Sequence, residues 1–171
     1  MLKCWLKLLC LVPAIAGTLL TVPAYAAKPT WDQVANVKDA AERLAKLQRS
    51  AGANGVLKFL DACYRTHTLA SKFTQGLEAC MAQDYMHSQV LASIYAKLPP
   101  EARSKPDALT PETIAKSMGD RFAVIVNQYA ISAEQTAAFK RTVDTHAFPI
   151  FLKAVFPNAE AAPSAQPDAK K

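Results

Sequence analysis

Apolar residues recur at three- and four-residue spacing along most of the chain, which is the period of α-helices with one buried face. No segment alternates apolar and polar residues in the manner of a half-buried strand. The first stripe follows Thr30-Trp31-Asp32-Gln33, which has the form of a capping box with Thr30 as the N-cap, and we expect this helix to end at Gly52. Its inward positions are Val34, Val37, Ala41, Leu44 and Leu47.

The next two stripes predict a helical hairpin. One helix is expected from Asn54 to about His67, and a longer one from a start between Ser71 and Thr74 to the stop at Pro99-Pro100. Because the connection between them is short, the two helices should lie antiparallel. Their inward positions are Val56, Leu57, Leu60, Cys63, Tyr64 and His67 in the first helix, and Leu77, Cys80, Met81, Asp84, Tyr85, Leu91, Ile94 and Leu98 in the second.

Two more helices follow a polar connector at residues 99–109. Thr110-Pro111-Glu112 indicates a helix start, and Ser132 with Gln135 forms a second capping box. Pro149 breaks or bends the last helix, and the apolar residues 150–156 are expected to cap the core. The inward positions are Ile114, Met118, Phe122, Ile125 and Tyr129, then Phe139, Val143 and Ala147. The predicted fold is therefore an all-α, single-domain bundle of about five helices.

Cys63 and Cys80 lie at similar distances from the expected turn of the hairpin, and hence at similar heights on neighbouring helices. Packed helices can bring inward Cα atoms within the reach of a disulfide. We therefore predict one structural Cys63–Cys80 disulfide. The wide spacing is unlike the C-x-x-C arrangement of thiol-disulfide catalysts.

Residues 1–26 have the features of a cleaved export signal: Lys3 and Lys7, an apolar run from residue 8 to 20, and Ala24-Tyr25-Ala26 as the cleavage site. Cys4 and Cys10 would leave with it. The run is interrupted and falls short of a spanning helix, so no transmembrane segment is expected after cleavage. We predict a helical domain at residues 27–156, a disordered Pro/Ala-rich tail at 157–171, and a periplasmic or secreted location in a bacterium.

Removal of residues 1–26 takes away two lysines and no acid, so the formal charge falls from +6 to +4. The remaining basic residues are scattered among acidic ones, which argues against a nucleic-acid partner. No haem-attachment, zinc-protease, P-loop or dinucleotide motif occurs, so no cofactor is expected.

The candidate functional residues lie on the third expected helix and at the end of the second. His67 and Asp84 could join the two cysteines as a tetrahedral metal set, and Met86 and His87 could bind copper. Asp84 and His87, three residues apart, could instead serve as the general-base pair of a small hydrolase. The core or surface interpretation is favoured for each residue, so His67, Asp84, Met86 and His87 are kept only as candidates and no catalytic residue is assigned. His87 is expected on the surface or partly buried.

The sequence thus favours a binding protein over an enzyme. We expect an exported protein that acts by binding or protein interaction, as an envelope adaptor or a stress-protective holdase, with an unidentified protein or small-molecule partner in the cell envelope. The apolar residues 148–156 are the expected contact patch. A metal-binding or metal-carrying protein and the Asp84/His87 hydrolase are the alternatives.

Overall fold

The computed structural model describes residues 29–103 and 109–158, which form α-helices and contain no strand. The predicted all-α class is confirmed. The expected signal at 1–26 and residues 159–171 of the expected tail lie outside the described residues. The helices are α1 (Gln33–His67), α2 (Gln75–Ala96), α3 (Pro100–Arg103), α4 (Pro111–Gln128), α5 (Ala133–His146) and α6 (Phe148–Val155).

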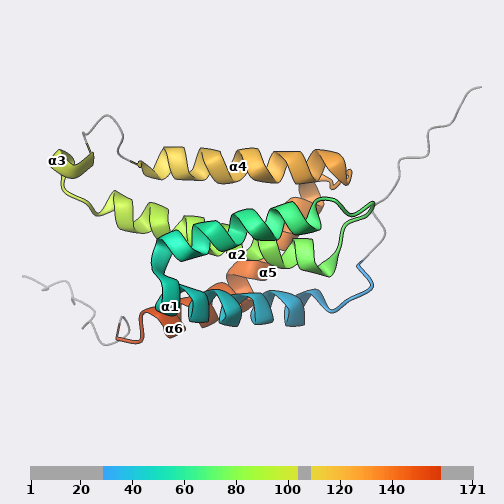
Figure 1. The fold of residues 1–171 in the computed structure, drawn as a ribbon, viewed down its shortest axis with the longest axis horizontal. Coiled ribbons are helices and arrows are strands. Elements are labelled where there is room, and N and C mark those ends of the chain that lie inside the picture. Colours follow the sequence, from blue (N-terminus) through green and yellow to red (C-terminus); the bar gives the residue numbers. More distant parts are fainter. Residues whose placement is uncertain (1–28, 104–108, 159–171) are drawn as a thin grey trace, which may run out of the picture.

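The first two expected helices form one element, α1, with a sharp bend at Gly52. The backbone of Gly52 has φ 63° and ψ −171°, a combination that is essentially restricted to glycine. Figure 1 shows the consequence: the chain reverses direction at the bend, and the second half of α1 returns above the first. The predicted helix end at Gly52 is therefore correct, although no loop separates the two halves.

Short polar side chains mark the helix starts. Thr74 accepts a hydrogen bond from the Leu77 amide at the start of α2. The helix start at Thr110 and the capping box at Ser132 are confirmed, and Thr110 also forms a capping box, with Thr113, that was not predicted. The predicted cap of α1 is wrong, because Asp32 rather than Thr30 accepts the hydrogen bond from Ala35. Both side chains are N-cap formers, and the sequence alone did not distinguish them.

The expected polar connector contains one short helix, α3. Pro100 is its first residue, where proline loses no hydrogen bond, and the Ala102 amide donates to the Pro99 carbonyl. The prolines that end α2 therefore also start this turn.

Helix α2 is the central element of the bundle. Residues 77–88 are buried without interruption, including polar Glu78, Gln83, Asp84 and His87. Figure 1 shows α4 on one side of α2 and the first half of α1 on the other, with α5 crossing behind. A helix enclosed in this way must satisfy its polar side chains within the protein.

Glu78 shows how this is done. Its buried carboxylate accepts hydrogen bonds from Trp31 Nε1 at 2.6 Å, Gln33 Nε2 at 2.6 Å and Asn36 Nδ2 at 2.8 Å. Gln83, five residues on, donates to the Ala40 carbonyl. These bonds set the register of α2 against the first half of α1.

The disulfide Cys63–Cys80 joins the second half of α1 to α2, as predicted, with a Cα–Cα distance of 5.9 Å. The turn that follows α1 is held from the end of α4, where the Tyr129 hydroxyl is within hydrogen-bond distance of the Thr68 and Ala70 carbonyls. The hairpin is thus fixed covalently at its helices and by hydrogen bonds at its turn.

Helix α6 packs against α1 and α5, with Phe151 completely buried. The Arg49 guanidinium donates to the Ala154 carbonyl near the end of α6. Across residues 29–103 and 109–158, none of the helices combines the length and the apolar character needed to cross a bilayer.

Two glycines offer a direct test of the bend. A Cβ at Gly52 or at Gly119 would meet no atom within 4 Å, so substitution by alanine adds no clash at either site. Gly52→Ala should lower the free energy of unfolding by about 1–3 kcal/mol because of its backbone. Gly119→Ala, in the middle of α4, should raise it by up to about 1 kcal/mol. Urea unfolding measures both changes, and a neutral or stabilising Gly52→Ala would contradict the assigned backbone conformation.

Candidate functional site

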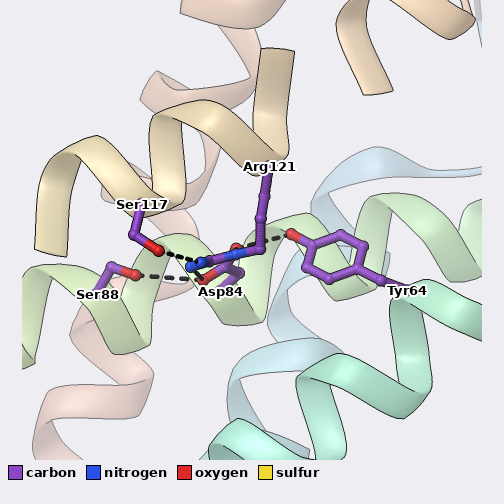
Figure 2. Close-up of polar contacts among 5 residues, drawn as sticks. All are labelled: Tyr64, Asp84, Ser88, Ser117 and Arg121. Atoms are coloured by element: carbon purple, nitrogen blue, oxygen red, sulfur yellow. Dashed lines mark hydrogen bonds and ion pairs between the residues drawn. The ribbon is translucent and has the colours of Figure 1, made fainter. Parts of the chain in front are cut away.

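The Asp84 carboxylate, whose side chain is 1% exposed, accepts four hydrogen bonds from described residues. Arg121, from α4, donates to it from Nε at 2.8 Å and from Nη2 at 2.6 Å, and also donates to Ser117 on its own helix. Figure 2 shows the guanidinium lying across the carboxylate with Ser117 beside it. This is a bidentate ion pair, the strong form of such a contact.

Two hydroxyls complete the cluster. Tyr64 donates to Asp84 at 2.9 Å from the second half of α1, and Ser88 donates at 3.2 Å from one turn along α2 (Figure 2). Each carboxylate oxygen now accepts two hydrogen bonds, which fills the capacity of the group. Burial, followed by the charge of Asp84, raises the pKa of Tyr64, so this phenol stays protonated.

The cluster does not bring Asp84 and His87 together as the alternative hydrolase interpretation requires. His87 is 2% exposed, so its expected surface or partly buried position is wrong. Its Nε2 is buried with no hydrogen-bond partner among the described residues, and Asp84 has no acceptor position left for it. Ser88 donates to Asp84 and not to a base. Burial lowers the pKa of His87, which keeps the ring neutral.

The residues considered as metal ligands do not lie together in the structure. His67 lies beside Cys63 and Cys80, whose sulfur atoms are within 4.8 Å of its ring nitrogen. Asp84 belongs to the Arg121 cluster, and Met86 is completely buried in the core. Among the described residues, neither Asp84 nor His87 joins the His67 group.

Two of the grooves formed by the described residues bear on the function. The first, of about 440 Å³, lies between the second half of α1 and α4, and its polar lining includes Tyr64 and Arg121. Because both groups are already bonded to Asp84, and because Asp61 and Arg65 on the rim pair with each other, its charges are compensated internally.

The second groove, of about 610 Å³, lies between the end of α2 and helix α6. It involves the predicted contact patch only in part, because Phe151 turns into the core while Phe156 is 39% exposed. We call it the α2/α6 groove. Its apolar lining is formed by Val90, Ile94, Phe148, Pro149, Leu152, Phe156 and Pro157.

Two lysines were missed as site residues from sequence. Lys97 and Lys153 line the α2/α6 groove, and no carboxylate does so among the described residues. Neither lysine forms an ion pair with another residue that the structure describes. Nothing in the local sequence signals this pair, because the two lie 56 positions apart and meet only through the packing of α6.

These features describe an all-α domain with one disulfide, a buried ion-pair cluster and an apolar groove with a basic rim. The chain has no significant match to a protein-family model, to a curated protein or to a solved structure.

The ion-pair cluster predicts a ranked mutant series. Arg121→Met leaves a buried carboxylate without its cation and should lower the free energy of unfolding by about 3 kcal/mol, a value moderated by the 38% exposure of the arginine side chain. Tyr64→Phe removes one hydrogen bond and should cost about 1.5 kcal/mol. Lys116→Met, which breaks an exposed pair on the same helix, should change stability by under about 0.5 kcal/mol. Urea unfolding tests the order, and an Arg121 effect no larger than that of Lys116 would contradict it.

His87 predicts a pH dependence. Burial lowers the pKa of His87 below the ordinary histidine value of about 6.5. Below about pH 6.5 the unfolded chain therefore binds a proton that the folded protein does not. This contribution to the free energy of unfolding is fully present above this pH and is lost as the pH drops through the lowered pKa. His87→Leu should therefore lose less stability than the wild type between about pH 7.5 and 5. His146→Gln serves as the control and should keep the wild-type dependence. An equal change in the free energy of unfolding with pH for His87→Leu and wild type, measured by urea unfolding across this range, would refute the prediction.

Proposed function

We propose that this protein is an exported adaptor that binds an amphipathic, acidic helix of a partner protein in the α2/α6 groove. The observation that carries the proposal is the combination, in one open groove, of apolar walls and two lysines, with no carboxylate among the described residues that line it. A protein of this kind acts by binding and needs no catalytic group.

The shape of the groove favours a helix as its occupant. Two helices, α2 and α6, form its walls, and the exposed edges are Ile94 at 45% and Phe156 at 39%. A small molecule is usually enclosed over most of its surface, whereas a helix uses one apolar face in an open groove. The exposed apolar residues at the edges of the groove therefore suit a helical segment better than a small ligand.

The charge of the groove favours an acidic occupant. Lys97 follows the last residue of α2 and Lys153 lies in the last turn of α6. An apolar stripe flanked by Glu or Asp would place opposite charges against both ammonium groups. Such rim contacts add specificity and speed of association more than affinity.

The proposed export is supported by two observations. The first 26 residues carry the signal pattern described above, and a structural disulfide suits an oxidising compartment. Both observations support an interaction in the cell envelope or outside the cell.

The proposal is tested with a synthetic helix as the probe. A fluorescent peptide of about 18 residues, with leucines at i, i+3, i+4 and i+7 and glutamates on the flanks, should bind the purified protein in the micromolar range. Lys97→Glu/Lys153→Glu should weaken binding at least tenfold and improve binding of the same peptide with lysines in place of glutamates. Fluorescence anisotropy measures both affinities.

Matched controls separate the groove from the rest of the surface. Leu152→Asp places a charge on the apolar wall and should weaken both peptides, while Leu69→Asp, at a residue 87% exposed that lines neither groove, should leave binding unchanged. Equal binding of both peptides to the wild type would overturn the charge argument. If the protein instead suppresses aggregation of an unfolded protein regardless of charge, the adaptor is replaced by a holdase.

A further inference from the structure

The surroundings of the disulfide contain a third possible ligand. Cys63 and His67 lie one turn apart at the end of α1, and Cys80 faces them from α2. The two sulfur atoms and one nitrogen of the His67 ring all lie within 4.8 Å of one another. Two cysteines and one histidine are a known zinc ligand set that leaves a fourth position for water.

Gly76 provides an independent observation that the histidine has a defined place here. A Cβ at residue 76 would overlap the imidazole of His67, so the ring occupies space that only glycine leaves open. Gly76 has no positive φ, so its backbone conformation does not require glycine. The absence of a side chain at residue 76 instead leaves the space in which the ring sits beside the sulfurs.

The backbone already suits a metal site. The Cα–Cα distance of 5.9 Å holds the two cysteines side by side. Ligand atoms bound to one tetrahedral zinc lie about 3.3–3.8 Å apart, so rotation of side chains is enough to reach that geometry. Asp84 is not the fourth ligand, because its oxygens are filled by Arg121, Tyr64 and Ser88.

We propose that reduction of the Cys63–Cys80 disulfide converts this place into a zinc site formed by Cys63, Cys80 and His67, with water as the fourth ligand. The reductant is a dithiol, which gives two electrons and two protons, breaks the S–S bond and becomes a cyclic disulfide. Zinc then displaces the two thiol protons as it binds. Attack begins at Cys63, which is half-buried, whereas Cys80 is completely buried.

The test is a zinc titration of the purified full chain, oxidised and reduced, without oxygen and in competition with a chromophoric chelator. The reduced protein should bind one equivalent of zinc, and the oxidised protein should bind none with comparable affinity. His67→Ala should weaken binding at least tenfold, while His146→Ala should leave it unchanged. Cobalt in place of zinc should give the thiolate charge-transfer bands of a tetrahedral site.

A second variant separates a built site from two free thiols. Gly76→Ala keeps all three ligands but displaces the ring, and should weaken binding as His67→Ala does; Gly119→Ala is its control. Wild-type affinity in Gly76→Ala, or equal binding by oxidised and reduced protein, would overturn the proposal. So would loss of helical circular dichroism in the reduced, zinc-loaded protein.

Discussion

The burial of residues 77–88 of α2 is the constraint on which the rest of the structure depends. Polar side chains in this stretch need partners within the protein, and Glu78, Gln83, Asp84 and Tyr85 find theirs on α1, α4 and α5. Glu78 and Gln83 bind the first half of α1, Asp84 binds the second half of α1 and α4, and the Tyr85 hydroxyl donates to Asp144 of α5 at 3.2 Å. The apolar core supplies the driving force for collapse, whereas these bonds decide which helix lies against which face.

Much of the fold could be predicted because its signals are local. A cap such as Thr110 or Ser132 acts on amides within three residues, and the stripe of Ile114, Met118 and Phe122 needs only helical geometry. The surroundings of His87 could not be predicted in this way. Helix α2 packs against α4 and α5, which occur far along the chain, and a polar residue that looks solvated in the sequence is in fact 2% exposed.

The candidate sites also differ in whether local signals in the sequence could predict them. The disulfide followed from the register of two adjacent helices, which loop length and helical rise determine. The α2/α6 groove depends on the turn between α5 and α6 and on the packing of α6 against α1 and α5. Lys97 and Lys153 become neighbours only through that packing, which is why their shared environment was not visible in the sequence. The position of His67 depends on the missing side chain of Gly76. This glycine is visible in the sequence, but only the packing of the hairpin shows that it lies against His67.

The ion pair between Asp84 and Arg121 also limits how this chain can change over generations. A buried carboxylate that has lost its cation is costly, and so is a cation moved against an apolar replacement for the carboxylate. The two residues are 37 positions apart, yet neither can be exchanged alone without loss of stability. Sequence change at these two positions therefore requires paired substitutions, in which two apolar residues replace the two charged ones. Related chains should therefore preserve the pairing of these two positions even where the residues themselves differ.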